Sequence, residues 1–417
     1  MASGAIDQGR RNVRDKAQER RRKRGRGARL GRADRTPLGT WFWEIDRVLL
    51  LLVTVLIGIG LIAVAAASPA AAMRYSNANL TFPPLYYFYR QAIWIAIAVP
   101  VMIGVSMLPK PVARRAAMVG AGIFVALLAL VPMIGNEVNG AQRWIHLGPV
   151  QVQPSEFLKP LFTVTLAWLL SLKAKDGSLP VIWLSFPMIG LVAFLLMKQP
   201  DFGQTVIFAS IWLLLLTLSG APIRFLAGLG AAGVGLIISA YLFYSVARTR
   251  IDAFLGLAED GAQIDSYQTD SAHNTLTNGG LIGTGPGAGT MKFRLPEPHT
   301  DYIFSVIGEE FGLVACLAIA FIYLAIVVRV FIKLLHEEDD FLLLASAGLV
   351  AQFGLQALIN MAVNVQIAPS KGMTLPFISY GGSSMVALSI GFGLLLAFTR
   401  ANPYLNRSPY VVKWNGR

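Results

Sequence analysis

Long runs of apolar residues, separated by short polar breaks, occupy almost the whole chain after residue 45. A helix needs about 20 mainly apolar residues to cross the roughly 30 Å of hydrocarbon in a bilayer, so each run predicts a membrane-spanning helix. About ten such runs lie near residues 46–67, 86–107, 113–134, 154–172, 180–197, 202–218, 223–246, 302–332, 341–365 and 380–399. The pattern predicts an all-α, polytopic integral membrane protein with a long loop between its seventh and eighth helices.

The basic residues of the short connections predict the orientation of these helices, because short loops rich in Lys and Arg stay in the cytoplasm. They place both ends of the chain on the cytoplasmic side. Three longer connections, residues 135–153, 247–300 and 366–379, then fall on the outer side. No stretch remains for a soluble catalytic domain, so we expect any chemistry at the membrane, mainly on that outer face.

Composition and charge add a tail at each end of this membrane domain. Hydrophobic residues make up 55% of the chain and charged residues only 14%, and residues 1–40 hold +9 of the net charge of +13 without one aromatic residue. A nucleic-acid-binding domain needs aromatics or a fold among its charges. We therefore interpret residues 1–45 as a basic, disordered cytoplasmic tail that contacts anionic lipid or a partner, residues 46–400 as the membrane domain and residues 401–417 as a short cytoplasmic tail.

The outer loop before the fourth helix carries the first candidate site, in NGAQRWIHLGPVQVQPSEFLK. Pro154 suits the first turn of a helix, and Glu156 and Lys159, three residues apart, share one face of it. An acid and a base at the mouth of an apolar span usually face a polar cavity, although a capped helix start with a lysine reaching the lipid headgroups explains the same spacing. Arg143 could hold a phosphate. Trp144 could stack on a sugar or anchor the chain at the membrane interface.

The second candidate site is LPEPHTDYIFSVIGEEFG, where the long eighth helix begins. Asp301 is either an N-cap for that helix or a functional carboxylate at the membrane mouth. Glu309 and Glu310 lie about 12 Å further along the helix, at a depth where carboxylates are costly unless they are paired or face a polar cavity. We expect at least one of these two glutamates to face the interior.

The third candidate site is PSKGMTLPFISYGGSS, from Pro369 to Ser384. Its glycines, prolines and small hydroxyl residues predict an irregular backbone that lines a cavity, since such backbone is not tolerated against lipid. Lys371 adds a cation on the outer face. Two other motifs are set aside: the glycine-rich Gly279–Gly289 lacks the Gly-Lys-Ser/Thr of a phosphate loop, and His336 lacks the second histidine of a metal-binding helix. The single cysteine, Cys316, is expected to be a buried hydrophobe.

Together, in this order and spacing, the three motifs resemble the SEDS family of bacterial cell-wall polymerases. The resemblance covers nearly everything after residue 45. It is closer to the cell-division branch than to the elongation branch, and the features that indicate this are PSKGMTLPFISYGG, the long basic N-terminal arm and YQTDSAHNTLTNGG. Ser370 and Gln366-Ile367-Ala368 depart from the usual family pattern.

The resemblance implies an inverting peptidoglycan glycosyltransferase that polymerises lipid II and releases undecaprenyl pyrophosphate. It assigns the general base to Asp301, with Glu156 holding Lys159 in place. Positive charge at the pyrophosphate would come from Arg143, Lys159, Lys371 or a divalent cation such as Mg or Mn. His299 is grouped with Arg143, Trp144 and Lys371 as substrate-binding.

The resemblance also implies a partner and a place in the cell. The partner is a class B penicillin-binding protein, a transpeptidase, among other division proteins in the bacterial inner membrane at the septum. Two further functions fit the same residues: a flippase that moves lipid II across the bilayer, and a scaffold that only recruits the transpeptidase.

Overall fold

The computed structural model describes residues 37–76, 81–138, 141–148, 150–176, 179–245, 248, 251–252, 263–369 and 372–400. The chain divides into two compact units, Met1–Ile45 with Arg400–Arg417, and Asp46–Thr399. The second unit contains all the helices that are long and apolar enough to cross a membrane among the described residues. It also contains every candidate site residue in those ranges.

Among the described residues of the Asp46–Thr399 unit there are ten apolar helices, eight of them of spanning length and two, α8 and α14, shorter. They are α3 Arg47–Tyr75, α4 Tyr86–Ser106, α5 Lys110–Ile134, α6 Pro154–Lys175, α7 Val181–Lys198, α8 Phe202–Leu218, α9 Ile223–Phe243, α12 Ile303–Leu334, α13 Asp340–Asn364 and α14 Gly382–Phe398. Each coincides with one of the predicted runs, so the prediction of an all-α polytopic protein is confirmed.

Several of these helices begin at residues whose chemistry favours a start. The carboxylate of Asp46 accepts hydrogen bonds from the amides of Val48 and Leu49 at the start of α3. Asp201 does the same for the amide of Gln204 at the start of α8, which places the break between α7 and α8 at the turn where two apolar runs meet. Pro154 occupies the first turn of α6, where its missing N–H costs no hydrogen bond.

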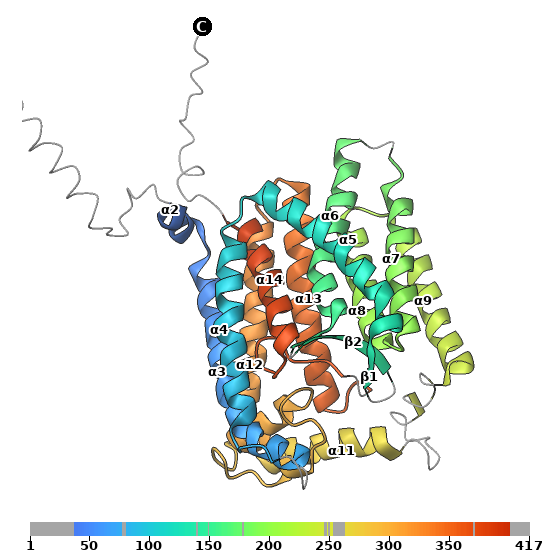
Figure 1. The fold of residues 1–417 in the computed structure, drawn as a ribbon. Coiled ribbons are helices and arrows are strands. Elements are labelled where there is room, and N and C mark those ends of the chain that lie inside the picture. The colour runs from blue at the N-terminus through green and yellow to red at the C-terminus, as the bar shows by residue number, and fades with distance from the viewer. Residues whose placement is uncertain are drawn as a thin grey trace, which may run out of the picture. The chain divides into compact units, whose positions relative to one another are not determined.

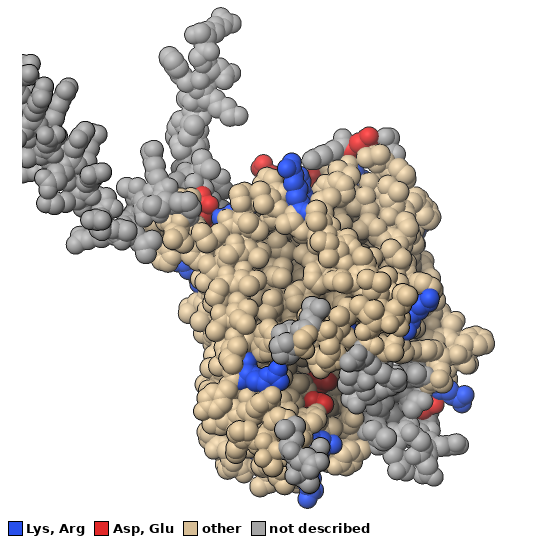
Figure 2. Space-filling model, viewed as in Figure 1, with Lys and Arg blue, Asp and Glu red and all other residues tan. Residues whose placement is uncertain are grey.

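The core of the unit is built around α6, α13 and α14 (Figure 1). Helix α14 packs against α4 and α6, and α13 packs against α6 and α12. Helix α9, at the edge, has no buried residue. On the face shown in Figure 2, Lys, Arg, Asp and Glu gather toward the two ends of the bundle and leave a broad uncharged band between them, as a bilayer requires.

The connections predicted to lie on the outer side contain more regular structure than the sequence predicted. Residues 135–153, expected as a loop, form an antiparallel sheet of β1 Asn136–Val138, β2 Ala141–Leu147 and β3 Val150–Val152, in the order β1-β2-β3. The 247–300 loop contains α11 Gln263–Asn278, which contacts α12 and α13, and the short 3-10 helix η2 Met291–Arg294.

The N-terminal tail differs from the prediction at its end. Residues 37–44 form helix α2, Pro37–Glu44, so disorder is the wrong description for that part of the tail. The proline at the first position of PLGTWFWE favours a helix start here, because its missing N–H costs no hydrogen bond in the first turn. The basic segment before it and the 401–417 tail lie outside the described residues. Cys316 is buried and unbonded to another cysteine, as expected.

Candidate active site

The first turns of α6 carry a buried ion pair. Lys159 Nζ lies 2.8 Å from a carboxylate oxygen of Glu156, and the two residues are only 1% and 6% exposed. A lysine that is this deeply buried does not place its ammonium group among lipid headgroups. The simple alternative of a headgroup-reaching lysine is therefore wrong, and the pair faces the protein interior.

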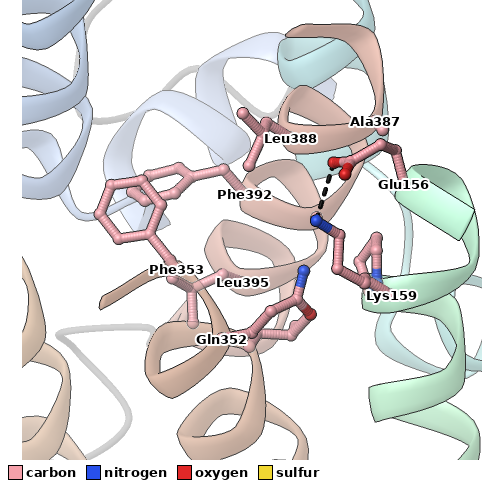
Figure 3. Close-up of a pocket in the computed structure, with 11 residues that line it drawn as sticks. Glu156, Lys159, Gln352, Phe353, Ala387, Leu388, Phe392 and Leu395 are labelled. Carbon is pink, nitrogen blue, oxygen red and sulfur yellow. Dashed lines mark ion pairs between the residues drawn. The ribbon is translucent and has the colours of Figure 1, made fainter. Parts of the chain in front are cut away.

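Neighbouring amides complete the surroundings of this pair. Lys159 Nζ donates to Gln356 Oε1 of α13 at 2.9 Å, and Gln204 Nε2 of α8 donates to the second carboxylate oxygen of Glu156 at 2.8 Å. The pair lies at one wall of a small cavity that α13 and α14 close with apolar side chains, including Phe353, Phe392 and Leu395 (Figure 3). The ion pair is surrounded largely by apolar side chains and has lost its hydration. Its stability therefore depends on these hydrogen bonds.

A row of four amide side chains on α13 links the pair to the second candidate site. Gln352, Gln356, Asn360 and Asn364 recur every fourth residue and are buried or nearly so. Asn360 Nδ2 donates to the main-chain oxygen of Asp301 at 2.8 Å, and Asn364 Nδ2 donates to the same oxygen at 3.2 Å. This row was not among the predicted site residues, although amides at a spacing of four within an apolar run were a readable signal of one polar helix face.

Asp301 lies in the turn before α12 and does not cap it. The N-cap position is Tyr302, and no side chain caps the helix there. The carboxylate faces the segment before α14: a Cβ atom on Gly372 would come within 3.2 Å of Asp301 Oδ2. The N-cap explanation for Asp301 is therefore wrong, and the side chain is available for another role.

Burial and neighbouring negative charges raise the pKa of the Asp301 carboxyl to about 7. Loss of hydration is the largest cause, followed by the charges of Glu297 and Glu156, while Arg143 acts in the opposite direction. Asp301 as a whole residue is partly exposed. A carboxylate with a pKa near 7 is a much stronger base than an ordinary aspartate, and both of its protonation states are accessible near neutral pH.

His299, two residues earlier, belongs to an aromatic cluster. Its ring centroid lies 4.2 Å from that of Tyr87, 5.2 Å from Tyr380 and 6.1 Å from Tyr75. Burial lowers the pKa of His299 to about 3, so its imidazole is neutral. Its main-chain oxygen accepts a hydrogen bond from the Tyr380 amide, which ties the Asp301 turn to the segment before α14.

Arg143 on β2 uses its guanidinium group on the protein itself. Nη2 donates to the main-chain oxygen of Pro200 at 2.6 Å, Nε donates to that of Gln199 at 3.3 Å, and Asp201 lies 3.8 Å away. Arg143 thus fastens the turn between α7 and α8 while its charge acts on Asp301. Trp144, the next residue on β2, is partly buried.

The segment before α14 has the irregular backbone that the sequence predicted. Residues 372–381 form no helix, Phe377 has a φ of 63°, and Leu375 and Ile378 are buried. Ser379 Oγ donates to the main-chain oxygen of Thr300 at 2.6 Å, which adds a further tie to the Asp301 turn. Lys371, predicted to bind substrate, lies outside the described residues.

Comparisons with known proteins point in one direction. A family model described as cell cycle protein, for FtsW, RodA and SpoVE, matches residues 46–404. Similar proteins include the probable peptidoglycan glycosyltransferases FtsW of Caulobacter vibrioides, 37% identical over 90% of this chain and 94% of that protein, and of Taylorella equigenitalis, 36% identical over 77% and 90%.

Solved structures agree with the sequence comparisons. A chain of a peptidoglycan synthase complex that coordinates polymerization and crosslinking superposes with a TM-score of 0.67, at 27% identity, over 85% of this chain and 97% of that one. The rod shape determining protein RodA of Thermus thermophilus gives a TM-score of 0.62, at 26% identity, over 85% and 96%.

Proposed function

This chain belongs to the FtsW, RodA and SpoVE family of cell cycle proteins, and we propose on that premise that it is a peptidoglycan glycosyltransferase that polymerises lipid II into glycan strands. We assign it to the cell-division branch, since the similar proteins named FtsW are 36–37% identical to it and the RodA structure is 26% identical. The elongation branch is the less favoured assignment.

The observation that carries this proposal is the Asp301 carboxylate, which belongs to a partly exposed residue in the turn before α12 and has a pKa of about 7. In the proposed reaction it accepts the proton of the 4-hydroxyl of an acceptor GlcNAc as that oxygen bonds to C1 of a donor MurNAc. The bond from C1 to undecaprenyl pyrophosphate breaks, and the configuration at C1 inverts. A base in this role must come within hydrogen-bond reach of the hydroxyl, about 2.6 to 3.2 Å.

The leaving pyrophosphate needs positive charge as it departs. The charge of Lys159 is already paired with Glu156, and Arg143 is bonded to the turn between α7 and α8, so we propose that both contribute through their field and their support of the site. Trp144 and His299 remain assigned to the substrate-binding region, with His299 as a neutral packing surface. Lys371 is retained as a candidate for direct contact.

A divalent cation is a further source of charge in this proposal. Mg²⁺ is commonly held by one or two carboxylates together with substrate phosphates rather than by a complete protein cage. Within the described ranges, no group of three or more His, Cys, Asp or Glu side chains could hold a metal ion. A shared site that forms with the pyrophosphate, near Asp301, fits these residues better than a preformed one.

The proposed partner is a class B penicillin-binding protein in the inner membrane, at the division septum. The similarity to a chain of a complex that coordinates polymerization with crosslinking supports a transpeptidase partner. We propose that the Asp301 end of the bundle faces outward and that both tails are cytoplasmic, as the distribution of Lys and Arg predicts.

Purified chain and partner transpeptidase, incubated with lipid II in detergent, provide the test. Detergent has no sides to cross, so formation of glycan strands there indicates polymerisation and not transport. Strands that are made by the wild-type chain and absent with Asp301→Asn support the proposal. A folded chain that moves lipid II in vesicles but yields no polymer in detergent with any candidate partner would favour the flippase.

A further inference from the structure

Two buried carboxylates on α12 are not used by the proposed chemistry. Glu309 is 0% exposed and Glu310 is 1% exposed, so both face the protein interior, as expected for at least one of them. A buried ionised carboxylate persists only where hydrogen bonds or opposite charges compensate for lost hydration. The partners of these two glutamates show what they hold.

Glu309 holds the start of η2. Its Oε1 atom accepts hydrogen bonds from the amides of Thr290 and Met291 at 2.8 and 2.7 Å, and its Oε2 atom accepts one from the amide of Lys292 at 2.9 Å. Asn278 Nδ2 of α11 adds a fourth, at 3.2 Å. One carboxylate thus binds three consecutive main-chain amides, and it fixes the position of this short segment against α12.

Glu310 holds the side chain of Lys292. The two form an ion pair in which both side chains are almost fully buried. Lys292 Nζ also donates to the main-chain oxygen of Ala66 in α3 at 2.9 Å, and the other Glu310 oxygen accepts the Gly287 amide at 3.1 Å. Lys292 therefore joins the loop before Asp301 to two membrane helices at once.

The backbone of α12 is interrupted next to these two glutamates. Gly312 has a φ of 79°, and the main-chain oxygens of Glu309 and Glu310 accept hydrogen bonds from the amides of Thr284 and Gly285. Gly283, with a φ of 91°, lies so close to α12 that a Cβ atom there would clash with the main-chain oxygen of Glu310. The glycine-rich segment, set aside above as a phosphate loop, is instead built into the break of α12.

These contacts fasten the two stems of the loop that contains Asp301, since residues 290–292 precede it and residues 309 and 310 follow it. We propose that Lys292, Glu309 and Glu310, here called the stem clamp, are positioning residues that hold Asp301 where the acceptor hydroxyl arrives. This rests on the proposed function. A base that shifts by about 1 Å loses on the order of a hundredfold in rate, so a fastened loop has a direct catalytic consequence.

The test separates positioning from stability with two kinds of variant. Glu310→Gln keeps the shape of the side chain and removes its charge, and Lys292→Met combined with Glu310→Gln removes both charges and leaves none uncompensated. Each is purified as the full chain with its partner transpeptidase. Measurements are the melting temperature, kcat and KM for lipid II, and hydrogen exchange of peptides that cover residues 295–301.

For both variants we expect kcat to fall about tenfold with little change in KM, because the base is displaced and substrate binding is not. We expect amides in residues 295–301 to exchange about tenfold faster while those of α13 do not change. The double variant should melt close to the wild-type temperature. Asp46→Asn is the matched control, since Asp46 pairs with Arg329 and Lys333 at the other end of α12. It should lower the melting temperature and leave kcat unchanged.

A double variant that regains both wild-type stability and wild-type kcat would show that the clamp only stabilises the fold, and would overturn the proposal. If the double variant does not fold, a folded Glu310→Gln with wild-type kcat and wild-type exchange at residues 295–301 overturns it equally. Absence of polymer from the wild-type chain would instead refute the proposed function, and the exchange measurement would still decide whether the clamp holds the loop.

Discussion

The side-chain amide of Asn360 donates to the main-chain oxygen of Asp301 at 2.8 Å and to that of Met373 at 2.7 Å. One nitrogen on α13 thereby joins the turn that carries the proposed base to the irregular segment that faces it. The backbone of Asp301 is held from α13, and its carboxylate is left to face Gly372.

Asn360→Ala should weaken that junction. Two main-chain oxygens lose their shared donor, which should cost about 1–3 kcal/mol of stability and lower kcat about tenfold, with KM for lipid II little changed. Turnover and thermal unfolding of the detergent-solubilised protein provide the measurement. Thr165→Val, which removes a hydrogen bond within α6 alone, is the matched control. Equal loss of kcat in both variants would contradict the assignment.

The pH profile should report the charge on Asp301. Because its folded-state pKa, about 7, lies above the ordinary value of 3.8, the base is ionised and active only as the pH rises through about 7. Glu297→Gln removes one of the negative charges that raise this pKa, so the acid limb of kcat/KM should move to lower pH. Glu338→Gln, in the exposed connection between α12 and α13, should leave the profile in place. A limb that does not move with Glu297→Gln would argue against Asp301 as the titrating base.

Removal of one partner from the α6 ion pair should damage the fold. Lys159→Met leaves Glu156 buried and uncompensated, which is expected to cost about 3–5 kcal/mol and to abolish most polymerisation. Combining it with Glu156→Gln should restore much of the melting temperature. Lys198→Met, at an exposed helix end, is the control and should change neither property. If Lys159→Met is as stable as the control, the ion pair does not stabilise the fold and the prediction is wrong.

The helices of this chain could be predicted closely because span length is a local property: α8 was expected at 202–218 and is found at Phe202–Leu218. The Glu156–Lys159 pair was also local, since residues three apart on a helix are neighbours. The sequence could not show that Lys159 meets Gln356, 197 residues away, or that Asn360 holds Asp301. The amide row marks one polar face of α13, but the sequence does not encode which helices and loops pack against that face.

Two features of the site involve the main chain and could not be predicted. Arg143 was predicted to hold a phosphate, and that stays a prediction; its guanidinium also donates to the main-chain oxygens of Gln199 and Pro200, which no side-chain pattern marks in advance. Asp301 was open to interpretation as an N-cap, yet α12 begins one residue later than that role requires. Main-chain partners are nearly invisible in a sequence because every residue except proline offers the same donor and acceptor.

Gly372 provides the most selective test of where the base lies. An alanine there would place a Cβ atom 3.2 Å from Asp301 Oδ2, so the carboxylate must give way by a few tenths of an ångström. Gly372 is exposed and its φ is not positive, so the added methyl group should scarcely alter stability. Since a 1 Å displacement of a catalytic group costs on the order of a hundredfold in rate, this smaller shift should lower kcat about threefold to tenfold at an unchanged melting temperature. Gly104→Ala, where a Cβ atom meets nothing within 4 Å, is the matched control. Wild-type kcat in a folded Gly372→Ala would show that the carboxylate has room to move without loss, and would remove the geometric support for its role as the base.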